Sequence, residues 1–183
     1  MVCLTGASGA VYGVNLLKYL KEVDGVTVHL VVSETGELIV NSELGMERDE
    51  LVSFADAFYE NVEMDSPIAS GSVKFDSLVI IPATMSTLSK ISVGISDNLI
   101  TRLGSVALKE RRRFVAVFRE APISTIHLEN LTKLSQNGVV VVPAAPGFYN
   151  RPKDIQDLVN SICSRVLDLI GIENEISPRY DGE

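Results

Sequence analysis

The sequence predicts an α/β fold with three layers, in which a parallel sheet is flanked by helices on both faces. Short runs of Val, Ile and Leu alternate with longer stretches of helical periodicity along the 183 residues. This alternation is typical of a parallel sheet wrapped by helices. No internal repeat or linker interrupts the pattern, so we expect one domain over residues 1–183, with a polar tail from about residue 173.

The first half of the chain supplies three of the expected strands, over residues 2–4, 26–32 and 78–81. The helices expected there cover residues 11–22, 34–41, 51–60 and 84–93. In the first helix, Val14, Leu17 and Leu20 recur at the spacing of one helix face. Ser33 is a suitable N-cap for the helix that follows the second strand.

In the second half, a helix capped by Asp97-Asn98 leads to a fourth strand over 114–118, and a helix over 124–136 leads to a fifth strand over 139–142. The last helix, over 154–170, has apolar residues at helical spacing. They are Ile155, Leu158, Val159, Ile162, Val166 and Leu169. The tail from Glu173 is polar, and we expect it to be loose unless a neighbouring subunit orders it.

Composition argues against several classes of function. The net charge of −8 disfavours nucleic acids and anionic membranes as partners. No apolar run approaches the roughly 18 residues of a membrane span, and the start is not typical of a signal peptide, so we expect a cytoplasmic protein. Cys3 and Cys163 lie in apolar segments and are expected to be reduced core residues. His29 and His127 are isolated, so metal-independent chemistry is expected.

The charges are unevenly distributed along the chain. Residues 1–97 hold 5 basic and 14 acidic residues, whereas residues 98–183 hold 11 basic and 10 acidic residues. An acidic protein that gathers Arg and Lys in one half can be concentrating them around an anion. Chance together with basic helix ends is the alternative, and charge alone does not decide between the two.

The stretch 108–122 combines a basic helix end, an apolar strand and the pair Arg119-Glu120. The pair follows the strand, and in open α/β sheets ligands bind at the carboxyl ends of the strands. Arg119 can hold a phosphate there, beside a carboxyl group, Glu120, that can transfer a proton. A solvated salt bridge is the structural alternative, because many exposed ion pairs contribute little.

Small and hydroxyl-bearing residues follow the other strands. At 6–9, the turn Gly-Ala-Ser-Gly allows backbone N–H groups to approach a phosphate at a helix N-terminus. A plain tight turn is the alternative, because the third glycine is not in register for a dinucleotide fingerprint. Ser33 follows the second strand, and Thr84, Ser86 and Thr87 follow the third. One serine is usually a helix cap, but donors after successive strands would line one crevice for a phosphorylated planar ligand.

Other charged residues have both a functional and a structural interpretation. Arg102 and Lys109 are seven residues apart and share one helix face, which a solvated basic face also explains. Arg111 to Arg113 are interpreted as such a solvated face. Arg165 lies at the edge of the last apolar stripe, where a purely solvated role is less natural. Glu43 can act as a general acid or base if it is desolvated, but alone it is more simply a surface carboxylate.

A series of motifs occurs over almost the whole chain. They are Thr5-Gly-Ala-Ser-Gly-Ala-Val-Tyr-Gly13, Ile68-Ala-Ser-Gly-Ser72, Asp97-Asn-Leu-Ile-Thr-Arg102, Leu108-Lys-Glu-Arg-Arg112, Arg119-Glu-Ala-Pro122 and Pro143-Ala-Ala-Pro-Gly-Phe-Tyr149. In these motifs and their order, the chain resembles the UbiX-type flavin prenyltransferases, once called aromatic acid decarboxylases. Two positions depart from the family pattern: Ala83 stands where Cys is frequent, and Tyr180 stands near a common C-terminal Trp.

The resemblance implies a flavodoxin-like or Rossmann-like flavoprotein that assembles into a homododecamer. It implies transfer of a dimethylallyl group from dimethylallyl phosphate to reduced FMN, without a metal. The product would be prenylated FMN, the cofactor of UbiD-type decarboxylases. Whether the donor is a monophosphate or a pyrophosphate stays open.

The resemblance also implies roles for individual residues. Those expected to contact FMN are Gly6, Ala7, Ser8, Ser33, Thr84, Met85, Ser86, Thr87 and Arg119. Tyr149 and Arg165, with Lys109, are expected to hold the prenyl phosphate, and Arg102 is expected to add positive charge beside the flavin. Glu43 and Glu120 match the family's acidic pair. With Lys109 they form the expected catalytic set, in which Glu120 transfers the proton.

Two alternatives remain at this point. A flavoprotein of the same fold, such as an FMN-dependent cysteine decarboxylase or a flavin reductase, would keep a flavin crevice without requiring the Arg, Lys, Tyr and Glu residues of the prenyl site. A non-catalytic flavin carrier would bind FMN and release it unchanged.

Overall fold

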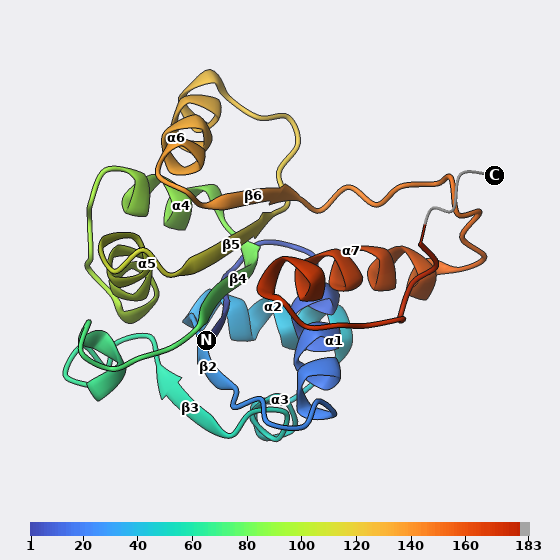
Figure 1. Ribbon diagram of the computed structural model, residues 1–183, viewed down its shortest axis with the longest axis horizontal. Helices are drawn as coiled ribbons and strands as arrows, with labels where there is room; N and C mark the ends of the chain where they lie inside the picture. The colour runs from blue at the N-terminus through green and yellow to red at the C-terminus, as the bar shows by residue number, and fades with distance from the viewer. Residues whose placement is uncertain (180–183) are drawn as a thin grey trace.

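Six parallel strands form one sheet in the computed structural model, which describes residues 1–179 (Figure 1). The strands are β1 (Val2–Leu4), β2 (His29–Val32), β3 (Ala57–Glu60), β4 (Ser77–Ala83), β5 (Arg113–Phe118) and β6 (Val140–Pro143). Their order across the sheet is β3-β2-β1-β4-β5-β6. The chain therefore builds outward from β1 in one direction and then from β4 in the other, and the order reverses between these two strands. In doubly wound sheets this reversal point is where ligands bind.

Helices cover both faces of the sheet. They are α1 (Ala10–Lys21), α2 (Glu34–Leu44), α3 (Arg48–Val52), α4 (Met85–Ser92), α5 (Leu99–Lys109), α6 (Thr125–Gln136) and α7 (Ile155–Ile170), with a short 3-10 helix η1 (Pro67–Ala69). Helices α1, α2 and α7 pack on one face, and α4, α5 and α6 pack on the other (Figure 1). The predicted α/β fold with helices on both faces is confirmed.

Alternation along the strands divides the apolar residues between two cores. In β1, Val2 and Leu4 join the core that contains Leu17 of α1, whereas Cys3 points into the core that contains Leu103 of α5. Successive strand residues face opposite sides of a sheet, so a strand buried on both faces has to be apolar throughout. This explains why the short Val, Ile and Leu runs are reliable strand signals here.

The two cysteines are buried free thiols, as predicted. Burial raises the pKa of both Cys3 and Cys163 to about 12. Neither thiol is therefore a nucleophile near neutral pH.

The helix predicted over 51–60 is wrong. The segment instead holds the end of α3 and the strand β3, which pairs in parallel with β2 from His29↔Ala57 to Val32↔Glu60. β3 is an edge strand whose four residues are all partly exposed, so it lacks the apolar run that marks the inner strands. Its pairing partner lies far away in the sequence, and local pattern does not reveal that contact.

The last helix and the tail also differ in detail from expectation. The apolar spacing predicts Ile155 on the buried stripe of α7, but this residue is 75% exposed, because α7 begins at the outer end of the extended segment after β6 (Figure 1). The expected looseness is wrong for residues 173–179, which fold back on α7 through Asn174 and Arg179. Tyr180 lies outside the described residues. Within residues 1–179, no helix is both long and apolar enough to span a bilayer.

Candidate active site

Thr5 joins the two halves of the sheet at the reversal point. Its side chain is 3% exposed, and its Oγ1 donates to the carbonyl of Pro82 at 2.7 Å and accepts from the N–H of Thr84 at 2.8 Å. The backbone N–H of Thr5 donates to the same carbonyl at 3.1 Å. The turn after β1 and the start of α4 after β4 are thereby fixed side by side. The sequence placed Thr5 in a motif but assigned it no role.

The glycines of the first turn allow close packing around this point. Gly9 caps α1 with a φ of 101°, a conformation that favours glycine. A Cβ on Gly13 would lie 2.4 Å from the carbonyl oxygen of Ile81, so α1 approaches β4 as only glycine permits. This is the packing role of the third glycine in dinucleotide folds, performed here at a different spacing. Gly6 packs equally closely on Thr35 at the start of α2.

Ser8, Glu43 and Arg119 come together beside this turn. The Glu43 carboxylate accepts hydrogen bonds from the N–H groups of Gly9 at 3.0 Å and Ala10 at 2.9 Å. Arg119 donates from Nε to the carbonyl of Ser8 at 3.4 Å. Partial burial opposes ionisation of Glu43, but the bonds from Ser8, Gly9 and Ala10 and the charge of Arg119 outweigh it and hold its pKa below the ordinary value. Three of the sequence-predicted residues thus form one cluster.

Two further helices begin at the same edge. Thr84 caps α4 by accepting from the N–H of Thr87, and its hydroxyl donates to the Thr87 hydroxyl at 2.9 Å. Ser33 caps α2 by accepting from the N–H of Gly36 at 3.0 Å. Met85 is buried against the core and Ser86 is exposed. Helix N-termini with exposed hydroxyl groups suit an anionic ligand.

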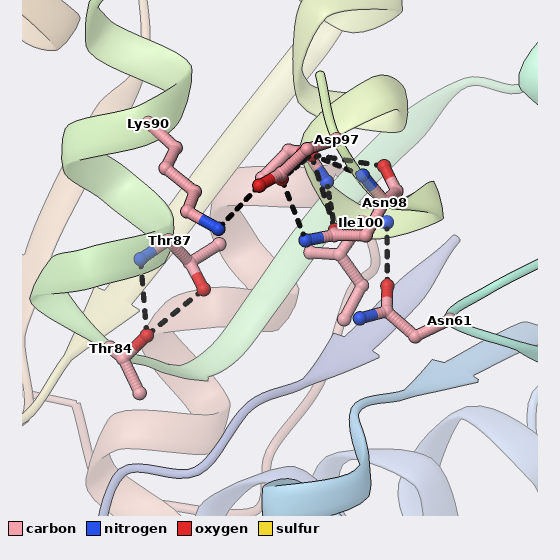
Figure 2. Close-up of polar contacts among 8 residues, drawn as sticks. Asn61, Thr84, Thr87, Lys90, Asp97, Asn98 and Ile100 are labelled. Atoms are coloured by element: carbon pink, nitrogen blue, oxygen red, sulfur yellow. Dashed lines mark hydrogen bonds and ion pairs between the residues drawn. The ribbon is translucent and has the colours of Figure 1, made fainter. Parts of the chain in front are cut away.

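A polar network fixes α4 against α5 and the end of β3 (Figure 2). Lys90 of α4 forms an ion pair with Asp97 at 2.6 Å. Asn98 and Thr101 form a capping box at the start of α5. Asn61, directly after β3, accepts from the N–H of Leu99 at 2.8 Å through its carbonyl and from the N–H of Ile100 at 3.0 Å through Oδ1. No sequence signal indicated Asn61, because it follows the edge strand β3, which has no apolar run.

Tyr149 and Arg165 line a second space, a cavity of about 570 Å³ between the segment after β6 and α7. We name this space the donor cavity. It is bounded by Pro143, which pairs with Phe118 directly before Arg119. The N–H of Ala144 also donates to the Phe118 carbonyl at 2.8 Å. The ends of β5 and β6 therefore connect the Ser8–Glu43–Arg119 cluster to the donor cavity. Tyr149 is 71% exposed at its rim.

Lys109 and Arg102 lie elsewhere. Helix α5 starts beside Asn61 at the carboxyl edge and ends at Lys109, four residues before β5 begins at Arg113. Lys109 is therefore at the amino edge, where it forms an exposed ion pair with Glu110 at 2.8 Å. The sequence does contain a signal for this location: Lys109 comes shortly before a parallel strand, and residues before such a strand lie at the amino edge of the sheet. One copy of the chain does not bring Lys109 to Arg119.

Arg102 donates from Nε to the carbonyl of Ala69 at 2.9 Å and lines a cavity of about 480 Å³ with Ser66 and Ser70. Among the described residues, the buried hydroxyl of Ser66 has no hydrogen-bond partner. Glu120 follows Arg119 and is exposed. A further cavity of about 360 Å³ at the amino edge is lined by none of the predicted site residues.

Arg112 corrects the interpretation of Arg111 to Arg113 as a solvated face. Its guanidinium donates to the carbonyls of Gly71 and Val73, each at 2.7 Å, and stacks 4.1 Å from the ring centroid of Phe75. It therefore holds the loop that follows η1. Within residues 1–179, no three His, Cys, Asp or Glu side chains gather in a way that could hold a metal, and metal-independent chemistry stays a prediction.

Comparisons with known proteins agree with one another. A family model described as Flavoprotein matches residues 1–167. Flavin prenyltransferase UbiX of Methanocaldococcus jannaschii is 46% identical over 180 residues, which are 98% of this chain and 97% of the relative. The chain belongs to the UbiX-type flavin prenyltransferase family. The resemblance stated from the motifs is confirmed.

Solved structures of UbiX-type proteins match over the whole chain. A crystal structure of AnUbiX (PadA1) in complex with FMN and dimethylallyl pyrophosphate matches with a TM-score of 0.97 at 36% identity, covering 100% of this chain and 96% of that one. A dodecameric FMN-dependent UbiX-like decarboxylase from Escherichia coli O157:H7 matches with a TM-score of 0.95 at 39% identity and covers both chains completely. The cysteine decarboxylase TvaF, at 21% identity and a TM-score of 0.62, shares the fold alone.

The residues of this UbiX-type chain fit a flavin phosphate with one refinement. The residues of the first turn are compatible with either a phosphate site or a plain tight turn, and the N–H groups of Gly9 and Ala10 at the start of α1 donate to Glu43. Hydrogen-bond donors compatible with an anion are instead the starts of α2 and α4, the exposed hydroxyl of Ser86 and the Arg119 guanidinium, because the Ser8 hydroxyl also bonds to Glu43. These groups surround the reversal point, where the fold provides a crevice for a planar ligand.

Proposed function

We infer that this chain is a flavin prenyltransferase that transfers a dimethylallyl group from dimethylallyl phosphate to reduced FMN. The observation that carries the inference is the connection, through the paired ends of β5 and β6, between the Ser8–Glu43–Arg119 cluster and the donor cavity. A transferase for two phosphorylated substrates needs two adjacent anion sites. The family to which the chain belongs supplies the reaction.

The flavin is bound at the reversal point in this proposal. Gly6, Ala7, Ser8, Ser33, Thr84, Met85, Ser86, Thr87 and Arg119 form its site. Arg119 is well suited to the boundary between the substrates, because a guanidinium can donate to a phosphate or carbonyl oxygen on either side. Reduced FMN supplies the nucleophilic nitrogen that takes up the dimethylallyl carbon.

The donor occupies the cavity of Tyr149 and Arg165. When the allylic C–O bond breaks, the electron pair leaves with the phosphate, whose negative charge must be stabilised. Cationic side chains and a phenol provide this stabilisation without a metal. Glu120, beside Arg119, transfers the proton during bond formation and phosphate loss. Glu43 orders the turn that carries Ser8.

Arg102 and Lys109 enter the site from another copy of the chain. Within one copy, Lys109 lies at the amino edge of the sheet, far along α5 from the carboxyl edge. The Escherichia coli O157:H7 relative with the same fold is a dodecamer. We therefore propose a homododecamer in which neighbouring copies complete each site. The product, prenylated FMN, passes to a UbiD-type decarboxylase in this proposal. The cytoplasmic location of the protein stays a prediction.

The other flavin functions are less well supported. A cysteine decarboxylase, a flavin reductase or a flavin carrier would need the flavin crevice but not the donor cavity with Arg165 and Tyr149. The cysteine decarboxylases share only the fold with this chain.

The test is anaerobic incubation of the protein with reduced FMN and either dimethylallyl phosphate or dimethylallyl pyrophosphate, followed by mass spectrometry of the released flavin. A mass gain of one dimethylallyl unit is expected with at least one donor. Unmodified FMN with both donors would refute the proposal. Oxidative decarboxylation of a cysteinyl peptide would favour the decarboxylase instead.

A further inference from the structure

An ion pair between Asp168 and Arg179 lies in the wall of the donor cavity, and the proposed function gives it no role. Arg179 donates from its two terminal nitrogens to the two oxygens of Asp168, at 2.8 and 3.1 Å. Asn174 donates to the same carboxylate at 3.1 Å. Both oxygens of this carboxylate are therefore engaged by residues of the C-terminal segment.

Asp168 is also placed to interact with Arg165. The two residues are three apart on α7, so they share one helix surface, and both line the donor cavity. The hydrogen bond from Arg179, with further help from the charge of Arg165, holds the pKa of Asp168 below its usual value. Asp168 is thus an ionised carboxylate beside the guanidinium that is proposed to hold the donor phosphate.

The segment that carries Arg179 is held in place at a second point. Asn150, in the segment after β6, donates to the carbonyl of Pro178 at 2.7 Å. Ser177 and Pro178 also line the donor cavity. The cavity wall therefore positions Arg179 opposite Asp168 through contacts independent of the ion pair.

We propose that Arg179 is a positioning residue for the prenyl donor, because by pairing with Asp168 it leaves Arg165 available to the donor's phosphate. The proposal rests on the proposed function, since it takes a phosphate as the occupant of this cavity. If Arg179 is removed, Asp168 pairs with Arg165 and competes with the phosphate for the same guanidinium. If Asp168 is neutralised, that competition is absent whether or not Arg179 is present.

A purely structural role predicts a different pattern. If the ion pair only ties the C-terminal segment to α7, breaking it from either side should disturb the cavity in the same direction. The effect of Asp168→Asn therefore separates the two roles.

The experiment measures the KM for the donor, kcat and FMN affinity in the wild type, Arg179→Ala, Asp168→Asn and the double variant. Arg179→Ala is expected to raise KM about three- to fivefold, the range for one solvent-exposed ion pair, with kcat and FMN affinity nearly unchanged. Asp168→Asn is expected to leave KM at or below the wild-type value, and the double variant to return to it. Arg48→Ala, which breaks the comparably exposed ion pairs of Arg48 with Glu37 and Glu60, should change none of these values.

The inference is overturned if Asp168→Asn raises KM as Arg179→Ala does, or if Arg179→Ala has no effect. Should the wild type prenylate FMN from neither donor, the proposed function fails by itself. The affinity of the same proteins for inorganic phosphate, measured by titration without turnover, then tests the role proposed for Arg179. Arg179→Ala must weaken phosphate binding and Asp168→Asn must not, whereas equal affinities in all three proteins overturn it.

Discussion

Glu43 shows how a single side chain determines what a helix N-terminus can bind. Its carboxylate accepts from the first N–H groups of α1, and the helix dipole favours its negative charge. The same carboxylate lies near Ser8 and Arg119, so it orders the turn after β1 that carries Ser8. Glu43 therefore fixes the positions of its neighbours, and its catalytic role stays a prediction.

A pH-dependent loss of stability should follow from removing this charge. The pKa of Glu43 is lowered from its ordinary value of 4.5, so its stabilisation is present above that value and is lost as pH falls through the lowered pKa. Glu43→Gln should cost about 0.5 kcal/mol at pH 7, a small amount because the group is largely solvated. Thermal unfolding midpoints of the two proteins at equal protein concentration should differ at pH 7 and converge as the pH falls below the lowered pKa of Glu43. A gap that widens on acidification would contradict this account.

Glu120 is predicted to act on the chemistry and not on binding. Glu120→Gln should retain FMN but slow prenylation by about 100-fold or more, the usual contribution of a general acid or base. Glu129→Gln, an exposed carboxylate on α6, is the matched control and should be fully active. Full activity in Glu120→Gln, measured by the mass of the released flavin over time, would remove Glu120 from the mechanism.

At the scale of the elements, the joint between β1 and β4 depends on one buried hydroxyl. Thr5→Val keeps the shape of the side chain but leaves the Pro82 carbonyl short of a donor and the Thr84 N–H without its acceptor. The expected cost is about 1–3 kcal/mol of stability, together with weaker flavin binding because the start of α4 is displaced.

Thr5→Ser keeps the hydroxyl and should retain most of the flavin affinity, which fluorescence titration measures below the unfolding temperature. Equal flavin affinity in Thr5→Val and the wild type would show that the hydroxyl does not position α4. A loss in Thr5→Ser as large as in Thr5→Val would point to the missing methyl group instead.

Helix starts were predictable from the sequence because their signals are local. Ser33, Asn98 and Ser124 each accept a hydrogen bond from an N–H in the first turn of the helix they precede. β3 was not predictable in the same way, because an edge strand with partly exposed residues is defined by its neighbour β2. The exposure of Ile155 was not predictable for a similar reason, because it depends on how far α7 extends beyond the sheet on which it packs.

At the scale of the whole molecule, only part of the site follows from strand order. Ser8, Thr84 and Arg119 were expected together, since the carboxyl ends of parallel strands share one edge. Their grouping around Thr5 and Glu43 is present in the structure, while their roles toward FMN stay predictions. The family motif groups Lys109 with them, but in one copy Lys109 lies at the amino edge of the sheet, and its place in the site stays a prediction.

A mixed-oligomer experiment tests whether copies share their sites. Lys109→Ala and Arg119→Ala should each be inactive alone, because each removes one residue from every site. Co-expressed in equal amounts, they should recover about a quarter of the wild-type rate if each site takes Arg119 from one copy and Lys109 from another. The mass of the purified oligomer and its rate of FMN prenylation are measured together. No recovery in a verified mixed oligomer would contradict the sharing of sites between copies, and full activity of either variant alone would remove that residue from the site.

The joint at Thr5 has a practical consequence for handling the protein. The hydrogen-bond donors proposed to bind FMN follow strands on both sides of the joint, so neither half of the sheet alone can retain the flavin. The yellow colour of a preparation would then report that the two halves have assembled correctly. Release of FMN during heating, followed by flavin fluorescence, should coincide with global unfolding and not precede it.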